Sequence, residues 1–487
     1  MIIRRAFVAL MILLPAALVS ADDWPTYRHD NRRSGATPEN LLPPLKPVWR
    51  YDSPSEPATA WTGPAKWNAY AGIKGLKHMR DFDSVFHVTV AGGSVFFGSS
   101  VDDAIHCLDA ASGKAKWTSH ADGPVRLPPS IADGRAYFGS DDGRAYCVKA
   151  SDGSAVWKYR AAPSDRFVPS NGKLISLWPV RTGVLVSGGK AYFAASLFPW
   201  RESRFCGVDA GTGKDSGPGL FATVGSGHSM QGALLASDTK IFAPQGRSGA
   251  IVFSRGDGKF ANGLASKGDG GVHAILTKDS QLIYGPGSRT GWLAVQDSNT
   301  RKRIGSFADA SRIVMGDKTG YIYKPGNLST LEYVEHVKLG KQTAQLRDKQ
   351  RKLGGKLKAL SKAPKGEKNQ RETAEQASKR KAEREDLQRE LRAIPAELKR
   401  LQAAANACFG WKADCPLAYE MILAGQTLFL GGDGQVHAIS ARDGKKLWTG
   451  KVDGKARGLA AANGRLYVST DRGKIHCFAA APGGAKR

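Results

Sequence analysis

Histidine is sparse in this sequence, and its ten residues are spread along the whole chain. His106, His437 and His476 occupy the same position of three similar short segments. Equivalent positions of separate repeats do not converge on one metal ion, which needs three or four ligands close together. We therefore interpret these three histidines as packing residues. His78 and His228 stand in irregular segments, and no second and third ligand can be assigned to either.

Paired aspartates mark several turns of the sequence. Asp102-Asp103 and Asp141-Asp142 lack the twelve-residue loop with a terminal Glu that is typical of a calcium-binding hand. Turn formation explains them, because Asp hydrogen-bonds its own backbone and tolerates a left-handed conformation. The sequence also contains no nucleophile elbow and no phosphate-binding loop. It therefore predicts no metal site and assigns no catalytic residue.

Aromatic and basic side chains occur instead in the long irregular segments. The candidates for binding a small ligand or cofactor are Trp61, Trp178, Trp200, Arg201 and His228. Convergence of these side chains would indicate a ligand site. Scattered, outward-facing side chains would favour a surface for protein partners.

The chain has six cysteines. Cys408 and Cys415 bracket the sequence FGWKAD closely enough for a disulfide, and the sequence leaves open whether it forms. Cys107, Cys147 and Cys477 share one position in three repeats, and we interpret them as buried thiols. The sequence has no CxxCH haem motif and no adjacent Cys pair.

The elements that must position these residues are internal repeats. Three ten-residue segments have closely similar sequences, namely LDAASGKAKW ending at Trp117, VKASDGSAVW ending at Trp157 and ISARDGKKLW ending at Trp448. A second pattern has an aromatic residue just after a turn, with eight members at Phe96, Tyr137, Tyr192, Phe242, Tyr284, Tyr323, Phe429 and Tyr467. Neighbouring members are 38 to 55 residues apart, except for one interval of 106 residues. The usual interval is the length of four short strands with their turns.

Each repeat predicts four antiparallel strands. Asp-Gly and Asn-Gly pairs supply the positive φ angles of tight hairpins, and the segments between them alternate with period two. Four strands repeated eight times predict an all-β fold, an eight-bladed β-propeller.

A tryptophan on the outermost strand of a blade has a structural role in this fold. A lone four-stranded sheet cannot bury both faces, so each blade packs on its neighbours, and an indole ring fills the widening gap between them. The predicted docking residues are Trp49, Trp117, Trp157, Trp411 and Trp448. The last repeat ends without a Trp strand, and KPVWRYD around Trp49 matches SAVWKYR around Trp157. The N-terminal strand is therefore expected to complete the last blade and close the ring.

The repeat resembles that of a known family. FGSDDGRAYCVKASDGSAVW is similar to the pyrroloquinoline-quinone (PQQ) type propeller repeat, and A-x-D-G-x-x-x-W resembles its tryptophan-docking signature. That family includes the outer-membrane assembly factor BamB and the quinoprotein dehydrogenases. The resemblance implies an eight-bladed ring from about Trp24 to the C-terminus, apart from one charged insert. It is weaker where Lys214-Asp215 and Lys259-Phe260 stand in place of a Trp strand.

The resemblance also raises the question of a cofactor. Dehydrogenases of this family clamp PQQ between a Trp and a disulfide of adjacent cysteines, and they hold calcium through Glu, Asn and Asp. No position of this sequence matches the calcium ligands, and the adjacent cysteines are missing. No cofactor is therefore predicted, with PQQ and calcium as the alternative, and no catalytic residue is carried over.

The charged insert covers residues 331–405 and has heptad periodicity. Its apolar residues fall into two runs, Leu339, Leu346, Leu353 and Leu360, then Leu387, Leu391, Ile394, Leu398 and Leu401. These runs predict an antiparallel α-helical coiled-coil hairpin with a break at 363–366, placed between the third and fourth strands of the sixth blade. Gly354-Gly355 should weaken the first helix, and Pro395 should kink the second.

Charge indicates the kind of partner. The formal net charge is +27 at pH 7, and residues 338–400 hold 20 Lys and Arg against 9 Asp and Glu. Such a basic arm favours acidic surfaces. We expect protein partners at the loop face and at the arm, with anionic envelope components as a further option, and no nucleic acid.

The N-terminus predicts export. Arg4 and Arg5 precede an apolar run from Ala6 to Val19, and Val19-Ser20-Ala21 has the small residues of a cleavage site. We expect cleavage after Ala21 and a periplasmic or secreted protein. No Cys follows the site for a lipid anchor, and no later run of eighteen apolar residues predicts a transmembrane segment.

The predicted organisation is a signal peptide at 1–21, a first propeller part at 22–330, the coiled-coil hairpin at 331–405 and a second propeller part at 406–487. Two functions fit it. One is a non-catalytic exported scaffold for protein interactions, similar to BamB in envelope or outer-membrane protein assembly. The alternative is a divergent PQQ-binding quinoprotein or a small-ligand binder. Because no catalytic residue can be assigned, we favour the scaffold over an enzyme.

Overall fold

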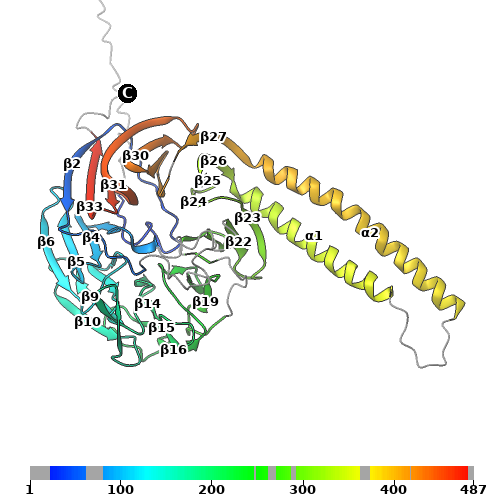
Figure 1. The fold of residues 1–487 in the computed structure, drawn as a ribbon, viewed down its shortest axis with the longest axis horizontal. Coiled ribbons are helices and arrows are strands. Elements are labelled where there is room, and N and C mark those ends of the chain that lie inside the picture. Colours follow the sequence, from blue (N-terminus) through cyan, green and yellow to red (C-terminus); the bar gives the residue numbers. More distant parts are fainter. Residues whose placement is uncertain are drawn as a thin grey trace, which may run out of the picture.

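The computed structural model describes residues 22–61, 81–245, 248–261, 270–271, 273–286, 292–361, 373–416 and 418–480. The expected signal peptide and His78 lie outside the described residues. Figure 1 shows sheets arranged around a central axis, with two long helices projecting from this ring.

Five sheets of the ring have four strands and one has three. The first two sheets are β3 (Val88–Ala91), β4 (Ser94–Ser99), β5 (Ala104–Asp109) and β6 (Ala115–His120), then β7 (Ser130–Ala132), β8 (Arg135–Gly139), β9 (Arg144–Lys149) and β10 (Ala155–Arg160). The next two are β13 (Leu185–Ser187), β14 (Lys190–Ala195), β15 (Glu202–Asp209) and β16 (Phe221–Ser226), then β17 (Leu235–Ala236), β18 (Lys240–Ala243) and β19 (Ile251–Ser254). Two more are β20 (His273–Leu276), β21 (Gln281–Gly285), β22 (Leu293–Asp297) and β23 (Arg303–Phe307), then β24 (Arg312–Met315), β25 (Thr319–Lys324), β26 (Gly326–Glu332) and β27 (Phe409–Cys415).

The remaining strands of the ring form one eight-stranded sheet. Its order is β1 (Ala36–Thr37), β28 (Glu420–Ala424), β29 (Thr427–Gly431), β30 (Asp433–Ser440), β31 (Lys446–Ala462), β32 (Arg465–Thr470), β33 (Lys474–Ala480) and β2 (Leu45–Asp52). The sheet is continuous because β31 is long. Its first part pairs with β30 and its second part with β32.

Inner and outer strands differ in burial. Every residue of β4 is buried, whereas β6 alternates between exposed and half-buried positions. An inner strand is covered on both faces and therefore tolerates only apolar or small residues, while an outer strand faces solvent along one side.

The N-terminal strand joins the end of the chain. β2 pairs antiparallel with β33, and Trp49 stands opposite Cys477. This is the pairing expected from the match around Trp49. The fourth strand of the last unit therefore comes from the other end of the chain.

Residues 22–39 contact the first strand of the sheets around the ring. Trp24 exchanges both backbone hydrogen bonds with Val90 of β3, and the carbonyl oxygen of Pro25 accepts from Ile131 of β7. The carboxamide of Asn31 donates to the carbonyl oxygen of Val186 in β13.

The same segment continues to the later sheets. The carbonyl oxygens of Asn31 and Arg32 accept from the backbone N–H groups of Ala236 in β17 and Leu276 in β20. β1 then pairs in parallel with β28. Glu39 accepts from the backbone N–H of Asn463, which follows β31, at 2.7 Å. One short segment thus ties together sheets that are distant in the sequence.

Four of the five predicted docking tryptophans make the same contact with the next sheet. Each indole Nε1 donates to an alanine carbonyl oxygen at 3.0 to 3.2 Å, from Trp49 to Ala110, Trp117 to Ala150, Trp157 to Ala210 and Trp411 to Ala441. Each ring covers the glycine three residues further on, at Gly113, Gly153, Gly213 and Gly444. A Cβ at these glycines would come within 2.5 to 2.8 Å of the ring, and all four have positive φ. Only glycine fits this contact.

The sheets without a Trp strand are joined differently. Phe221 of β16 covers Gly258, the corresponding glycine after β19. A phenyl ring thus takes the indole's place where the repeat departs from the family pattern.

Trp448 is the exception among the five. No hydrogen bond from its indole is found within the described part of the chain. Its ring lies over Gly450 of its own strand and 5.4 Å from the ring of Phe478 in β33. In the other sheets the receiving alanine and glycine lie in the turn between the third and fourth strands. That turn cannot exist here, because β33 and β2 belong to opposite ends of the chain.

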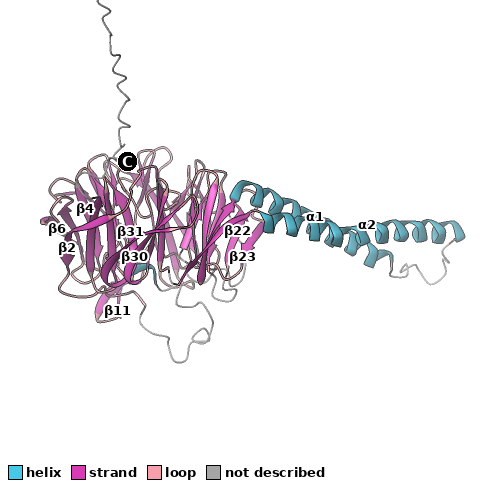
Figure 2. Ribbon diagram, turned by 90° about the horizontal axis from the view of Figure 1, so that it is seen from above, coloured by secondary structure: helices cyan, strands magenta, loops and turns pink. Residues whose placement is uncertain are grey.

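Two helices interrupt the sheet β24–β27. α1 (Tyr333–Leu360) and α2 (Ala374–Ala407) lie between β26 and β27, and the backbone N–H of Glu332 donates to the carbonyl oxygen of Cys408 at 2.8 Å. Thr373 and Gln376 form a capping box at the start of α2. We call α1 and α2 the helical arm. It projects sideways from the ring in Figure 2.

The helices of the arm run side by side and pack through their leucines (Figure 1). The contact residues are Leu346, Leu353, Leu357, Leu360, Leu387, Leu391, Ile394 and Leu398. α1 continues through Gly354-Gly355 and α2 through Pro395. The expected break at 363–366 falls outside the described residues. In the part of the chain that the structure describes, no helix is both long and apolar enough to cross a bilayer.

The base of the arm is attached to the ring by apolar contacts. Tyr333, Val337 and Leu401 belong to one buried cluster with Ile304 and Phe307 of β23. The arm therefore leaves the ring in a defined direction rather than from a free loop.

The disulfide between Cys408 and Cys415, which the sequence leaves open, is not formed in the structure, and both thiols are free and buried. Cys408 directly precedes the seven-residue strand β27, and Cys415 is its last residue. An extended strand of that length spans roughly 20 Å, whereas a disulfide needs Cα atoms about 4.4 to 6.8 Å apart. Short spacing in the sequence therefore does not bring these two cysteines together.

Candidate functional site

The five residues predicted for ligand binding do not converge on one pocket. Trp178 is buried in the core around β13–β16, and its indole donates to the carbonyl oxygen of Glu202 at 2.9 Å. Its surroundings are those of a packing residue. The other four form two groups, one around Trp61 and one around Trp200.

Trp61 covers a set of buried charges. Its indole Nε1 donates to Gln231 Oε1 at 3.0 Å, and its ring lies 5.6 Å from the Arg181 guanidinium carbon. A cation over the face of an indole is attracted by the ring quadrupole. The ring is 37% exposed, so one face is left to solvent.

Four charged residues below Trp61 neutralise one another. Arg126 lies between Asp83 and Asp141, with both contacts at 2.7 Å. Arg181 holds Asp141 through two hydrogen bonds of 2.9 and 2.8 Å. All four side chains are at most 5% exposed. We call this set the buried charge cluster.

The two carboxylates of the buried charge cluster differ in pKa. Burial would raise the pKa of Asp141, but Arg126 and Arg181 outweigh it and hold the value below the ordinary range. Burial dominates at Asp83, which has Arg126 as its nearest cation, and raises its pKa. Asp83 Oδ1 is also buried without a hydrogen-bond partner. Asp83 is therefore the weakest point of the cluster.

The buried charge cluster was not predicted from the sequence, although the sequence contains a signal for it. Pro124-Val125-Arg126 and Pro179-Val180-Arg181 repeat the same triplet, and each arginine stands four residues before the first strand of a sheet. Equivalent positions of neighbouring sheets approach each other near the axis of a ring. A repeated charged triplet there predicts a shared counter-ion, which is Asp141.

Trp200 belongs to the second group and is 75% exposed. Its ring stacks on Phe198 with centroids 5.0 Å apart. The neighbouring turn carries His228, whose ring lies 5.1 Å from that of Phe260, and partial burial lowers the pKa of this histidine. Gly227 donates its backbone N–H to the carbonyl oxygen of Pro199, which holds the two segments together. Arg201 is exposed beside this group.

A hairpin adds apolar surface next to Trp61. It consists of β11 (Phe167–Ser170) and β12 (Lys173–Ser176), and Figure 2 shows it protruding from the lower side of the ring. Leu174 is 66% exposed and Phe167 43%. Asn171 in its turn donates to the carbonyl oxygens of Thr59 and Ala60 at 3.0 Å. We use the name exposed aromatic patch for the exposed side chains of both groups together, which are Trp61, Phe167, Trp200, Phe260 and the aliphatic Leu174.

The residues near Trp61 do not fit a quinone with calcium. The carboxylates of the buried charge cluster are occupied by arginines, and the described residues contain no group of three or more His, Cys, Asp or Glu that could hold a metal ion. All six cysteines are free, so no disulfide is available to stack on a quinone opposite a tryptophan. We derive no chemistry through this cofactor.

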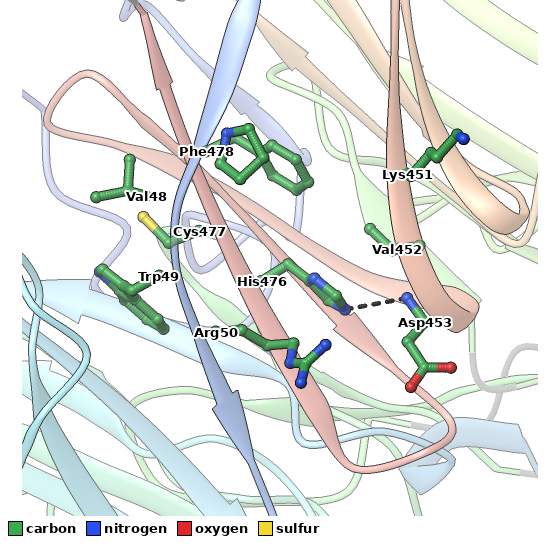
Figure 3. Close-up of a pocket in the computed structure, with 10 residues that line it drawn as sticks. Val48, Trp49, Arg50, Lys451, Val452, Asp453, His476, Cys477 and Phe478 are labelled. Carbon is green, nitrogen blue, oxygen red and sulfur yellow. Dashed lines mark hydrogen bonds between the residues drawn. The ribbon is translucent and has the colours of Figure 1, made fainter.

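A second candidate is a groove of about 550 Å³ between β2 and β31. Figure 3 shows Arg50, Lys451, Asp453 and His476 along it. The backbone N–H of Asp453 donates to His476 Nε2 at 3.1 Å, so this nitrogen carries no proton. Burial lowers the pKa of His476 to about 4. The groove lies beside Trp448, where the docking contact is missing, and we call this region the seam.

Fold and repeat together define a propeller of the PQQ type. The chain belongs to the family described as outer membrane protein assembly factor BamB, whose model matches residues 46–299 and 422–485. No curated protein matches the sequence.

Solved structures support the fold. A quinohemoprotein alcohol dehydrogenase from Comamonas testosteroni is similar with a TM-score of 0.57 at 13% identity, over 97% of this chain and 82% of its own. A europium-containing methanol dehydrogenase has a TM-score of 0.54 at 12% identity, over 94% and 98%. Sqt1 of Saccharomyces cerevisiae has 0.51 at 11%, over 82% and 96%. At such identities the likeness concerns the fold alone.

Proposed function

We propose that this protein is an exported, non-catalytic scaffold that binds protein partners through the exposed aromatic patch, in the assembly of envelope or outer-membrane proteins. The observation that carries the proposal is the exposure of this patch. It holds five of the ten exposed large hydrophobic residues found among the described residues. Clustered exposed apolar residues mark interaction sites, and tryptophan is prominent among the residues that dominate binding energy.

The support beneath the patch suits binding better than catalysis. The buried charge cluster has its charges paired internally, so it offers rigidity and few free groups for proton transfer. Trp61 is oriented by Gln231 and Arg181 before any partner arrives. Preorganised side chains lose less entropy on binding, which strengthens an interface of this kind.

The same proposal includes the finer architecture and location. We propose eight blades, with β31 as the last strand of the seventh and the first strand of the eighth. The helical arm is proposed to be a coiled coil, supported by its leucine contacts. The signal peptide at 1–21 and a periplasmic or secreted location belong to this proposal as well.

Photo-crosslinking in cells tests the scaffold function. A photoreactive amino acid replaces Leu174 or Trp200 in the full chain, and in matched controls it replaces Leu42 or Leu447, which are 57% and 48% exposed outside the patch. We expect discrete protein adducts from positions 174 and 200 and none from 42 and 447. Equal adducts from all four positions, or none from any, would contradict the proposal.

Adding PQQ and calcium to the purified protein tests the alternative. The scaffold proposal expects no change in the absorption spectrum of the quinone. A spectral change that Trp61→Ala abolishes would establish a quinone site and overturn the non-catalytic reading.

A further inference from the structure

Positive charge is distributed unevenly over the helical arm. α1 has eight Lys and Arg against two Asp and Glu, while α2 has eight against six. The two flanks of the arm differ more strongly in charge than the two helices do, because four of the six acidic residues of α2 lie together on one side.

One flank is neutralised by contacts between the helices. Four of the six acidic residues of α2 recur at spacings of three, four and seven residues, at Glu383, Asp386, Glu390 and Glu397. Residues spaced in this way share one side of a helix. Lys349 of α1 meets Glu390 at 2.7 Å. Lys352 and Lys356 follow Lys349 on the same side of α1, so the lysines of this flank face carboxylates.

The opposite flank carries more cations than carboxylates, and Glu385 is the acidic residue of α2 that shares it. Its cations are Arg347, Arg351 and Lys358 of α1 and Lys381, Arg384, Arg392 and Lys399 of α2. Helical geometry places each set on the side away from the Lys349–Glu390 contact, so the two sets adjoin across the antiparallel pair. All seven side chains are exposed. Of these, Arg351 alone forms an ion pair within the described residues, with Asp348. We call these seven residues the basic face.

The basic face is long and lacks apolar anchors. From Lys381 to Lys399 it extends roughly 27 Å at 1.5 Å per residue. Among the described residues of the arm, the one large hydrophobic side chain that is exposed is Val334, and it lies at the base. Protein interfaces depend on buried aromatic or apolar anchors, which this face does not offer. A face that offers charge alone suits a partner that presents many anionic groups in a plane.

We propose that the basic face binds the anionic headgroups of a lipid surface. Each Lys or Arg near such a surface contributes about 1 kcal/mol of attraction, and this attraction decays within a Debye length of about 10 Å at 0.1 M salt. Seven cations along a straight pair of helices can approach a plane together. The arm then lies along the lipid surface by electrostatic attraction, without insertion. This binding does not depend on the exposed aromatic patch.

Vesicle co-sedimentation of the full chain tests the proposal. Vesicles of phosphatidylcholine with about a third phosphatidylglycerol are compared with pure phosphatidylcholine, at low and high salt. Arg347, Arg384, Arg392 and Lys399 are changed together to Gln. The control changes Lys349, Lys352, Lys356 and Arg389 to Gln, which removes the same charge from elsewhere on the arm. Circular dichroism verifies that both variants keep their helices.

We expect binding to anionic vesicles that high salt abolishes. At about 1 kcal/mol per cation, the basic-face variant should lose on the order of 100-fold or more in affinity, and the control about threefold or less. Equal loss in both variants, binding to neutral vesicles, or tighter binding to duplex DNA of equal phosphate concentration would overturn the proposal. Trp200→Ser should bind vesicles as the unchanged protein does, so this result is separate from that of the scaffold test.

Discussion

A tryptophan stands at the seam and at four other joints between sheets, but it docks on the next sheet only at those four joints. Trp49, Trp117, Trp157 and Trp411 each donate to an alanine carbonyl and cover a glycine of the next sheet. Trp448 stands at the corresponding place, but its ring turns back over Gly450. An indole thus docks only where the neighbouring sheet presents the turn between its third and fourth strands.

Docking therefore needs two things, the indole side chain and a turn of the neighbouring sheet that receives it. At the seam, β33 and β2 are paired as in any other sheet, yet no turn joins them. The receiving surface is therefore missing although the strands are present. The groove at this joint is lined by residues of β2, β31 and β33, including Phe478, whose ring lies 5.4 Å from that of Trp448.

The largest expected effect comes from removing a docked indole. Trp157 is 9% exposed within the core around β9 and β15. Trp157→Ala should lower the free energy of unfolding by about 3 to 5 kcal/mol, because it leaves a cavity and an unpaired carbonyl. Trp448→Ala should cost about 1 kcal/mol or less, since its ring fills no such site. Urea unfolding followed by circular dichroism measures both, and equal losses would remove the distinction.

Adding one methyl group tests the receiving side of the contact. Gly153 has a φ of 73°, and a Cβ there would lie 2.5 Å from the Trp117 ring. Gly153→Ala should cost about 2 kcal/mol or more from backbone strain and displacement of the ring. Gly450→Ala is the matched change at the seam. It should cost about 0.5 kcal/mol or less, because a Cβ there meets only the far end of the Trp448 side chain, which can move.

A smaller effect is expected from pH at the seam. An unfolded histidine has a pKa of about 6.5, whereas burial lowers the pKa of His476 to about 4. The unfolded chain therefore binds a proton more readily, and stability falls as pH decreases from about 6.5 to about 4. His476→Gln cannot titrate but can still accept the Asp453 N–H. Its urea midpoint should fall less than that of the unchanged protein between pH 7 and 4.5.

The remaining acid sensitivity should come partly from His87, whose pKa burial also lowers to about 4. A His476→Gln variant as sensitive to acid as the unchanged protein would show that the seam histidine is accessible to protons. The same measurement on Trp448→Ala sharpens the point, because opening the seam should raise the pKa of His476 toward its ordinary value.

The features of the fold that could be predicted from the sequence are those that depend on local sequence patterns. Strands, turns and the family repeat depend on neighbours in the chain, such as Asp152-Gly153 before Trp157, and they were predicted in the right places. The helices and their position between β26 and β27 followed from heptads in the same way.

Features that depend on distant partners were missed or mistaken. Arg126 and Arg181 share Asp141 only because their sheets meet near the axis. Trp178 was assigned to a loop surface, but its surroundings bury it. Whether a residue of an irregular segment is buried or exposed depends on packing against distant parts of the chain, which the local sequence pattern does not reveal.

The order of synthesis gives residues 22–39 a further significance. They leave the ribosome before every strand that they bond, and Asn463, a partner of Glu39, is made 424 residues after it. Contacts between such distant residues form slowly, because a long loop must close first. The Glu39 carboxylate must therefore remain without this partner until Asn463 has been made, long after the backbone partners of Trp24 and Pro25. A chain released before Asn463 would keep the docked Trp117 and Trp157 of its early repeats and still lack the contact of Glu39 with the last sheet.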